Sequence, residues 1–352
     1  MYSLIILVAC LFGTTSAKQL LVLAPPIKAN EYYTEKFLDV IPFYVDYVNN
    51  VTGKDDVVVV VDEETMSYYK GKIDDSKLIE AHVDDPWLRD VSPPIPSSQV
   101  QFTYIGGGGK SEAKTTQDIY DKFIHSLNIK PNKTDLLLDG GNLVNNNEDG
   151  VITTKKFLTD NGLNEEQGIS ELQRLLGVQN VSILTPDEPT LAHADGQAAY
   201  VCRDAIYMQK QLEPNNTLYK NELKKGCPGC QIIEVDGFFD DRVYKGGYAS
   251  SCGVYVNCVV TDDFIYVPTF NHEKDAQALF EFRNNPCNKT VVPIDARVVC
   301  EMGGSLRCLS WQTSGTWAKQ IITHAAKESH ASMVRVSLCS FVVVFSALLI
   351  GF

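Results

Sequence analysis

Short hydrophobic runs alternate with amphipathic stretches from Gln19 to about Glu328. Runs of this kind, rich in β-branched residues and bounded by turn-forming residues, are typical of buried strands. The predicted strands cover residues 19–24, 56–62, 98–105, 134–139, 178–185, 204–210, 231–236, 263–270 and 291–295. Helices fit between several of them, and no low-complexity linker marks a boundary, so the pattern predicts a single α/β domain.

Three of the intervening segments have clear helical patterns, at residues 35–49, 164–176 and 273–284. The second begins at Asn164, a good N-cap, and carries two glutamates in its first turn, where the helix dipole favours negative charge. Its apolar residues fall on one side, and Gly177 ends it. No sequence repeat is visible, so periodicity does not indicate a repeating architecture.

The two ends of the chain are more hydrophobic than the rest. Residues 1–17 form an apolar run closed by small residues, which predicts a secretory signal peptide and a mature chain that begins near Lys18. Residues 329–352 combine small residues, a short polar stretch and an apolar tail, the pattern of a GPI-type anchor signal. A short single-pass anchor is the alternative. The catalytic domain is therefore expected at residues 18–328.

Composition narrows the possible partners. Hydrophobic residues make up 44% of the 352 residues, enough for a substantial core, and the net charge is -13. This charge argues against nucleic acid as a partner and suits a cationic substrate. The oligomeric state is left open.

Features of secreted proteins continue inside the domain. Five acceptor sequons for N-glycosylation occur, at Asn50, Asn132, Asn180, Asn215 and Asn288. Eight of the ten cysteines lie between the terminal signals, and an oxidising compartment makes disulfides among them expected. We therefore expect a glycosylated protein outside the cell, attached to the outer cell surface by its C-terminal signal.

Cys308 is a candidate nucleophile because two glycines, Gly303 and Gly304, precede it in EMGGSLRCLSWQ and allow backbone to approach a ligand. The structural alternative is half of a disulfide. If Cys308 is free, seven other cysteines remain between the terminal signals, so at least one more must be free. Cys258, in the strand-like run VYVNCVV, is the candidate for a buried unpaired thiol.

Three further segments carry groups that could act on a ligand. His193 and Asp195 in LAHADGQ would lie on one face of an extended chain, although a surface turn is the simpler interpretation. Arg89 and Asp90 follow Trp87 in DDPWLRD, where a core tryptophan and an ordinary ion pair are the simpler reading. Asp139 opens DGGN at the end of a predicted strand, where a tight turn would suffice.

Taken in order, the motifs WLRD, DGGN, HAD, VYVNC and GGSLRC resemble the agmatine deiminase and bacterial-type peptidylarginine deiminase family, a branch of the guanidino-group-modifying superfamily. The resemblance extends from Trp87 to Gln312. It implies a five-bladed, pseudo-symmetric α/β propeller (the pentein fold) and a hydrolase that needs no cofactor and no metal. The roles it implies are Cys308 as nucleophile, His193 as general acid and base, Asp90 and Asp195 as guanidinium-binding carboxylates, and Trp87, Asp139 and Asn257 as further substrate-binding residues. Arg307 is a separate substrate-binding candidate, because its charge could meet a substrate carboxylate.

The chain departs from the family pattern at three places. Arg307 stands where a histidine usually precedes the nucleophile, Asp139 where the agmatine enzymes commonly have glutamate, and Val254 where serine is common. These departures bear on the substrate more than on the chemistry. The expected compartment favours arginine in peptides over agmatine as the substrate.

The residue types suit deimination. Two carboxylates can fix the plane of a guanidinium, a thiolate can attack its carbon, and a histidine can protonate the departing ammonia and then activate water. The carboxylates disfavour a thiolate, so substrate binding is expected to promote its formation. Two alternatives remain: an amidinotransferase, and a non-catalytic cell-surface binding protein with Cys308 in a disulfide.

Overall fold

The computed structural model describes residues 18–188 and 190–329. The predicted signal peptide lies outside these residues, and so does the predicted anchor signal apart from Ser329. Within the described part of the chain, no helix combines the length and apolar character needed to cross a membrane.

All nine predicted strands are present, with small shifts at their ends. The strands are β1 (Leu20–Leu23), β2 (Asp56–Val61), β3 (Leu78–Glu80), β4 (Val100–Thr103), β5 (Asn132–Leu137), β6 (Val144–Asn145), β7 (Gly150–Thr154), β8 (Asn180–Leu184), β9 (Ala198–Cys202), β10 (Ala205–Gln209), β11 (Gln231–Val235), β12 (Val259–Val260), β13 (Phe264–Thr269), β14 (Thr290–Asp295) and β15 (Ser310–Thr313). Six of them, β3, β6, β7, β9, β12 and β15, were not predicted, because they are short or lack a distinct apolar run.

The three predicted helices are also confirmed, as α1, α6 and α8. The α-helices are α1 (Phe37–Val51), α2 (Glu63–Met66), α3 (Leu88–Val91), α4 (Lys110–Ser126), α5 (Lys155–Asn161), α6 (Glu165–Leu176), α7 (Asn215–Gly226), α8 (Asp275–Arg283), α9 (Arg297–Cys300) and α10 (Leu306–Leu309), and residues 315–329 are helical as well. Single 3-10 turns are η1 (Glu31–Tyr33), η2 (Asp75–Lys77), η3 (Gly140–Asn142), η4 (Ala194–Gly196) and η5 (Lys245–Gly247). Asn164 caps α6 in a capping box with Gln167, and Gly177 ends it in the left-handed conformation.

The strands form five separate small sheets in the described residues. Each contains a parallel pair whose strands are consecutive in the chain apart from helices: β1 with β2, β4 with β5, β7 with β8, β10 with β11, and β13 with β14. The first sheet has a second parallel pair, β2 with β3. Parallel neighbours need a crossover, and the helices α1, α4, α5 with α6, α7 and α8 supply one for each of the five pairs named first. The predicted α/β class is confirmed. The sheets do not join into a closed propeller.

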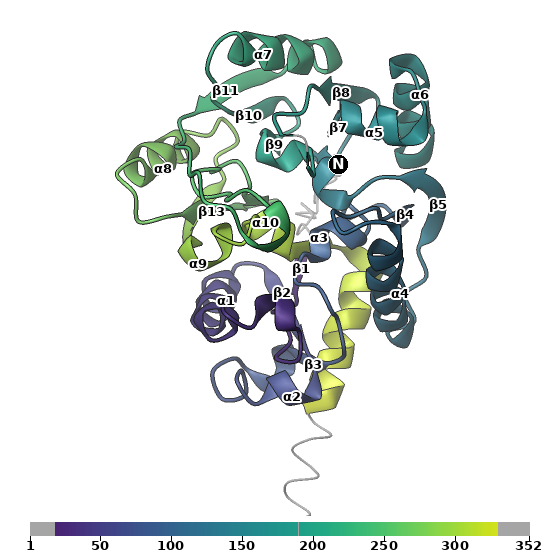
Figure 1. Cartoon of the computed structure of the whole chain (residues 1–352), viewed down its shortest axis with the longest axis vertical. Coiled ribbons are helices and arrows are strands. Elements are labelled where there is room, and N and C mark those ends of the chain that lie inside the picture. Colours follow the sequence, from purple (N-terminus) through teal and green to yellow (C-terminus); the bar gives the residue numbers. More distant parts are fainter. Residues whose placement is uncertain (1–17, 189, 330–352) are drawn as a thin grey trace, which may run out of the picture.

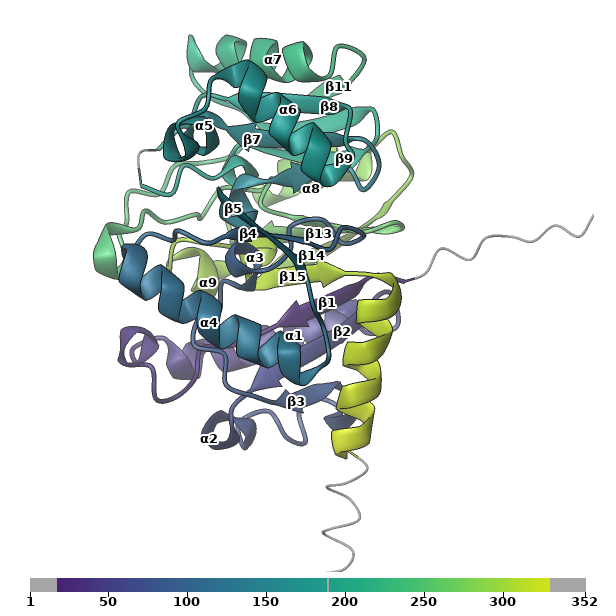
Figure 2. The same ribbon diagram turned by 90° about the vertical axis from the view of Figure 1, so that its right-hand side faces the viewer.

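In four of the sheets an antiparallel strand flanks the parallel pair, and β15 fills this position in the first sheet. Leu20 pairs with Thr313 and Leu23 with Ser310, so the last strand of the domain lies beside its first. This pairing brings the segment of Cys308 to the N-terminal sheet, as Figures 1 and 2 show.

Strand β2 shows why that sheet is stable. Its sequence DVVVVV is apolar at successive positions because both faces are covered. Val57, Val59 and Val61 pack in one cluster with residues of α1, whereas Val58 and Val60 pack in another with α4 and the helix at 315–329. Figures 1 and 2 show α1 on one side of the sheet and the other two helices on the opposite side.

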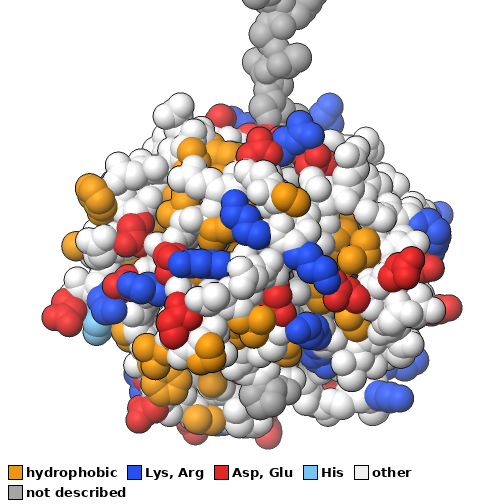
Figure 3. Space-filling view, turned by 90° about the horizontal axis from the view of Figure 1, so that it is seen from above, with side chains coloured by type: hydrophobic (Ala, Val, Ile, Leu, Met, Phe, Trp, Pro, Cys, Tyr) orange, Lys and Arg blue, Asp and Glu red, His pale blue; other side chains and the backbone are white. Residues whose placement is uncertain are grey.

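The net negative charge is not gathered into one patch on the face drawn in Figure 3. There, Lys and Arg side chains alternate with Asp and Glu side chains over the surface. The charge that bears on a ligand therefore has to be sought at the site itself.

Candidate active site

Each of the five motifs lies at a single turn that precedes an edge strand of one of the five sheets. The turns are α3 before β4, η3 before β6, η4 before β9, residues 254–257 before β12, and α10 before β15. Successive turns contact one another: α10 contacts α3, α3 contacts η3, and η3 contacts η4. Residues from distant parts of the sequence therefore meet at one centre, and none of these turns has a period that the sequence could reveal.

Cys308 has a free thiol in a buried position, 9% exposed. The amide of Asn257 lies at the sulfur, with Nδ2 3.2 Å from Sγ. The carbonyl oxygen of the same side chain accepts from the backbone N–H groups of Arg307 and Cys308, at 3.2 and 3.4 Å. Asn257 therefore fixes the turn that carries the sulfur. Cys258 is also free and buried, as predicted.

His193 lies between two carboxylates. Its Nδ1 is 3.7 Å from Asp90 Oδ1, and its Nε2 is 3.3 Å from Asp139 Oδ2. Backbone groups hold both acids, because Gly141 N–H donates to Asp90 and Ile105 N–H donates to Asp139, each at 2.9 Å. The imidazole is therefore oriented from both sides, as a general acid and base has to be.

Asp195, the second predicted guanidinium-binding carboxylate, lies beside the sulfur. Its Oδ2 is 3.8 Å from Cys308 Sγ and 2.9 Å from Arg307 Nη1. The second terminal nitrogen of Arg307 donates to the backbone carbonyl of Leu143 at 2.7 Å. Asp195 and Arg307 thus form a buried ion pair within the site.

The glycines of the motifs allow this packing. A Cβ on Gly304 would lie 2.4 Å from the ring of Trp87, and one on Gly141 would lie 2.5 Å from His193 Nδ1. Gly303 has φ +99°, which favours glycine. The paired glycines before Cys308 therefore let the tryptophan lie directly against the nucleophile turn.

Burial and neighbouring charges set the protonation states. Burial raises the pKa of Asp90 to about 7, against the opposite effect of His193. Burial alone would lower the pKa of His193, but Asp90, Asp139 and Asp195 raise it to about 9. Burial, with the charges of Asp195 and Asp90, raises the pKa of Cys308 well above its usual value. The empty site at neutral pH therefore holds a charged imidazole and a neutral thiol.

Two local interpretations are corrected by the structure. His193 and Asp195 lie neither on an extended strand nor on a surface turn: His193 caps the buried 3-10 turn η4 and Asp195 lies within it, because the chain turns there before it enters β9. Arg89 does not form a simple ion pair with Asp90. It is fully buried and donates to Gln312 Oε1 at 2.7 Å and to the carbonyls of Pro94 and Arg307. Arg89 therefore joins α3 to the nucleophile segment.

Residues beside Trp87 and Gly303 were missed because they lie outside the motifs. Asp85 accepts from Trp87 N–H at 3.1 Å and from Tyr33 Oη at 3.3 Å. Tyr248, from the segment after η5, packs against Gly107 and Gly303. Burial, together with the charges of Asp84 and Glu112, raises the pKa of Asp85 to about 6, although the hydrogen bonds from Trp87 and Tyr33 act in the opposite direction. The DDP before Trp87 was the available signal for this acid.

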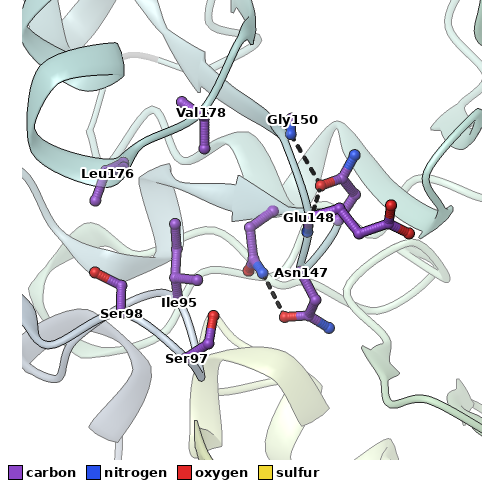
Figure 4. Close-up of a pocket in the computed structure, with 10 residues that line it drawn as sticks. Ile95, Ser97, Ser98, Asn147, Glu148, Gly150, Leu176 and Val178 are labelled. Atoms are coloured by element: carbon purple, nitrogen blue, oxygen red, sulfur yellow. Dashed lines mark hydrogen bonds between the residues drawn. The ribbon is translucent and has the colours of Figure 1, made fainter.

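A separate recess of about 160 Å³ lies away from these residues (Figure 4). Asn145–Asn147, Ile95 and Val178 are among the residues that line it, and Asn146 Oδ1 accepts from the N–H groups of Glu148, Asp149 and Gly150. None of the predicted site residues lines it. Its polar groups serve the tight turn between β6 and β7.

Three disulfides join six of the described cysteines: Cys202 with Cys287, Cys227 with Cys230, and Cys252 with Cys300. The Cys252–Cys300 bond ties the segment before Asn257 to the segment before Gly303. It therefore joins the two turns that hold the sulfur.

Replacing Cys252 and Cys300 with serine is expected to lower the free energy of unfolding by about 2–4 kcal/mol, since the bond closes a loop of 48 residues. It should also slow the reaction of Cys308 with iodoacetamide, because Asn257 would no longer be fixed against the thiol. Denaturant unfolding and mass-mapped alkylation would measure both. The control pair Cys202→Ser and Cys287→Ser should lose stability but keep the alkylation rate. Equal rates in both double variants would contradict this role.

Known proteins resemble this chain over most of its length. Agmatine deiminase of Pseudomonas fluorescens is 22% identical over 289 residues, covering 67% of this chain and 76% of its own. The solved structure of C. jejuni agmatine deiminase has a TM-score of 0.72 at 19% identity and covers 85% of this chain and 94% of its own. That of the Enterococcus faecalis enzyme has a TM-score of 0.70 at 16% identity, covering 85% and 93%.

Relatives in sequence are thus deiminases, hydrolases that act on guanidino C–N bonds, and the solved structures share the fold. The family model that matches this chain covers residues 13–313, a range that includes all five motif turns. The chain belongs to the Porphyromonas-type peptidyl-arginine deiminase family.

Proposed function

We propose that the protein hydrolyses the guanidinium of an arginine-type substrate to a ureido product and ammonia, through a covalent thiouronium on Cys308. The observation that carries this is the meeting of Asp90, His193, Asp195 and the free thiol of Cys308 in one buried site. Asp90 and Asp195 would accept hydrogen bonds from the guanidinium and fix its plane beside the sulfur.

The reaction then follows in two halves. The Cys308 thiolate forms a C–S bond to the guanidinium carbon, His193 gives its proton to one amino group, and ammonia leaves as the C–N bond breaks. Neutral His193 next accepts a proton from water, whose oxygen attacks the thiouronium carbon. The C–S bond breaks, the ureido product forms, and the hydroxyl proton is released. Asn257 and the backbone of Ser305 lower the pKa of Cys308 and so stabilise the departing thiolate.

The pH dependence follows from the protonation states of the empty site. The active form needs charged His193 and the thiolate of Cys308, one proton fewer than the form present at neutral pH. Since the pKa of Cys308 is raised, kcat/KM is expected to rise about tenfold per pH unit between about pH 6 and about pH 8. Asp90, with a pKa of about 7, binds a cation only when ionised and steepens the lower end of the rise.

The rise should weaken above about pH 9, where His193 loses its proton. Ammonia release at subsaturating substrate, measured across this range in buffers of constant ionic strength, checks the profile. A flat or falling profile between about pH 6 and about pH 8 would contradict the assigned protonation states.

The acids beside the site favour a substrate without a negative charge at its distal end. Asp85 lies near Tyr104 and Tyr248, and Glu112 lies near Tyr248; burial, with the charges of Glu112 and Asp85, raises the pKa of Tyr248. An α-carboxylate, as in free arginine, would be repelled by these acids, whereas the amine of agmatine would be attracted. Arginine within a peptide carries neither charge there. Agmatine and peptidyl arginine are therefore the favoured classes, and the acids favour agmatine.

Assays of citrulline, carbamoylputrescine and ammonia from agmatine, arginine peptides and free arginine test this proposal. Agmatine is expected to have the highest kcat/KM, and free arginine the lowest. Absence of ammonia from every one of these substrates would overturn the deiminase proposal. Transfer of the amidino group to an added amine in place of ammonia release and hydrolysis would identify an amidinotransferase. The binding-protein alternative is not favoured, because Cys308 is free.

The arrangement of the sheets is proposed to be the five-bladed, pseudo-symmetric propeller. Each sheet contains at least one parallel pair, and one motif turn precedes an edge strand of each sheet. The pairing of β15 with β1 would complete the first blade from both ends of the domain. Superposition of the five β-strand pairs with their turns would test the pseudo-symmetry.

The compartment is likewise a proposal: a secreted, glycosylated protein held at the outer cell surface. Three disulfides support it, and so does the exposure of the sequon residues Asn50, Asn132, Asn215 and Asn288. Asn180 is partly buried. Release of the protein from intact cells by a phospholipase that cleaves GPI anchors, with a mass decrease on deglycosylation, would test both parts.

A further inference from the structure

Arg307 precedes the nucleophile in sequence, but its side chain turns to the carboxylate beside the sulfur. The residue lies in α10 and is 4% exposed. Nη1 is 2.9 Å from Asp195 Oδ2, and Nη2 donates to Leu143 O at 2.7 Å. Its backbone N–H donates to Asn257 Oδ1. The guanidinium is therefore fixed from two elements, η4 and the end of η3.

This placement argues against the direct contact with a substrate carboxylate that the charge of Arg307 suggested. Both terminal nitrogens of Arg307 already donate to protein acceptors inside the site. Contact with a substrate carboxylate would require the buried pair with Asp195 to open, which leaves two buried charges unpaired. Asp85 and the acids near it also disfavour a substrate that carries such a carboxylate.

Charge balance indicates another role. The acids at the centre are Asp90, Asp139 and Asp195, and the cations are Arg89, Arg307 and protonated His193. When Asp90 is ionised, as binding of a cation requires, these charges cancel while Cys308 is a neutral thiol. A cationic substrate adds one positive charge, which the thiolate then balances. Without Arg307 the empty site would carry one negative charge more, and the thiolate would cost more to form.

We propose that Arg307 is a positioning residue for guanidino deimination: it holds Asp195 through one oxygen and offsets its charge beside the Cys308 sulfur, so that the thiolate forms when a cationic substrate binds. This inference rests on the proposed function. It differs from a substrate contact in the kinetic parameter that it affects. Loss of Arg307 lowers kcat and leaves the KM for a cation equal or lower, whereas loss of a substrate contact raises KM.

The test uses Arg307→Gln, which removes the charge, and Arg307→Lys, which keeps it. The matched control is Arg174→Gln, at an exposed arginine of α6 that pairs with Glu171. The first readout is the pH at which iodoacetamide alkylation of Cys308 is half-maximal, followed by peptide mass mapping so that Cys258 is counted separately. The second is kcat and KM for agmatine.

The alkylation midpoint of Cys308 depends on all the charged and polar groups that face its thiol. These are Arg89 and Asp90 on α3, Asp139 before η3, His193 and Asp195 at η4, and Asn257 and Cys258 before β12. Arg307→Gln is expected to raise the alkylation midpoint by about 1 pH unit or more and to lower kcat about 10- to 100-fold. Arg307→Lys should restore part of both, and Arg174→Gln should change neither.

If the Arg307→Gln variant does not fold, two other variants still test the proposal. Arg307→Lys should still shift the midpoint, but by less than the shift expected when the charge is lost. The double variant Asp195→Asn with Arg307→Gln removes both charges and should return the midpoint toward the wild-type value. A wild-type midpoint in Arg307→Gln, or a midpoint in the double variant that stays about 1 pH unit or more above the wild-type value, would overturn the proposal.

Kinetic outcomes separate the other roles. A raised KM at unchanged kcat would make Arg307 a substrate contact, and increased turnover in Arg307→Gln would mean that its guanidinium blocks the site of the substrate; either result overturns the positioning role. A wild-type protein that releases no ammonia would refute the proposed function, while the alkylation midpoints would still decide how Arg307 acts on the thiol.

Discussion

Replacing Cys308 with serine is expected to lower ammonia release by at least about 10³-fold while the fold remains intact. A serine hydroxyl stays protonated where a thiol can ionise, so no nucleophile of comparable strength would face the guanidinium carbon. The side chain nearly keeps its volume, and Asn257 can still donate to the oxygen. Steady-state ammonia release and thermal unfolding of the purified protein would measure the two effects.

Cys258→Ser is the matched control, because that thiol is also free and buried but has no assigned role. Burial raises the pKa of Cys258 to about 12. The control variant should retain turnover near the wild-type level. Covalent trapping tests the same point. When the wild-type protein is incubated with substrate and then quenched with acid, the peptide that contains Cys308 should gain mass. Retained turnover in Cys308→Ser would remove the nucleophilic mechanism altogether.

Replacing His193 with glutamine is expected to lower kcat by about 10²- to 10⁴-fold, the usual range for loss of a general acid and base. Glutamine can still donate to Asp139, but it cannot give a proton to ammonia or accept one from water. The midpoint of Cys308 alkylation should also rise, since the charged imidazole no longer balances Asp90 and Asp139.

A substrate analogue separates these functions of His193. An S-methyl isothiourea releases methanethiol, which needs less help from a proton donor than ammonia does, so the variant should lose less activity with the analogue in the first half of the reaction. Equal losses with both substrates would contradict proton donation to the leaving group. Wild-type rates with agmatine would contradict any catalytic role.

Helix α6 and strand β2 illustrate what could be predicted about the fold. Local chemistry marks α6 at both ends, through Asn164 and Gly177, and tertiary contacts only confirm it. The apolar run of β2 is typical of a strand covered on both faces. Strands β6, β12 and β15 were missed because each depends on its partner strand for its conformation and has little pattern of its own.

The candidate site divides in the same way. The motifs around Cys308, His193 and Asp90 carry residue types that guanidino chemistry needs, so the sequence could name them through a family resemblance. The sequence could not place Arg307, because its neighbour in the chain is the nucleophile but its partner is Asp195, 112 residues away. Asp85 and Tyr248 lie outside the motifs and meet the site only through folding.

By itself, then, the sequence determined the α/β class, the principal strands and helices, the family and the candidates for the nucleophile and its acid–base partner. These follow from local periodicity, capping and residue chemistry. Tertiary structure decided that β15 pairs with β1, that Asp195 is bound to Arg307, and that the imidazole is charged while the thiol is neutral. Those outcomes depend on burial and on charges brought within a few ångströms by distant segments, and neither is encoded in the spacing of residues along the chain.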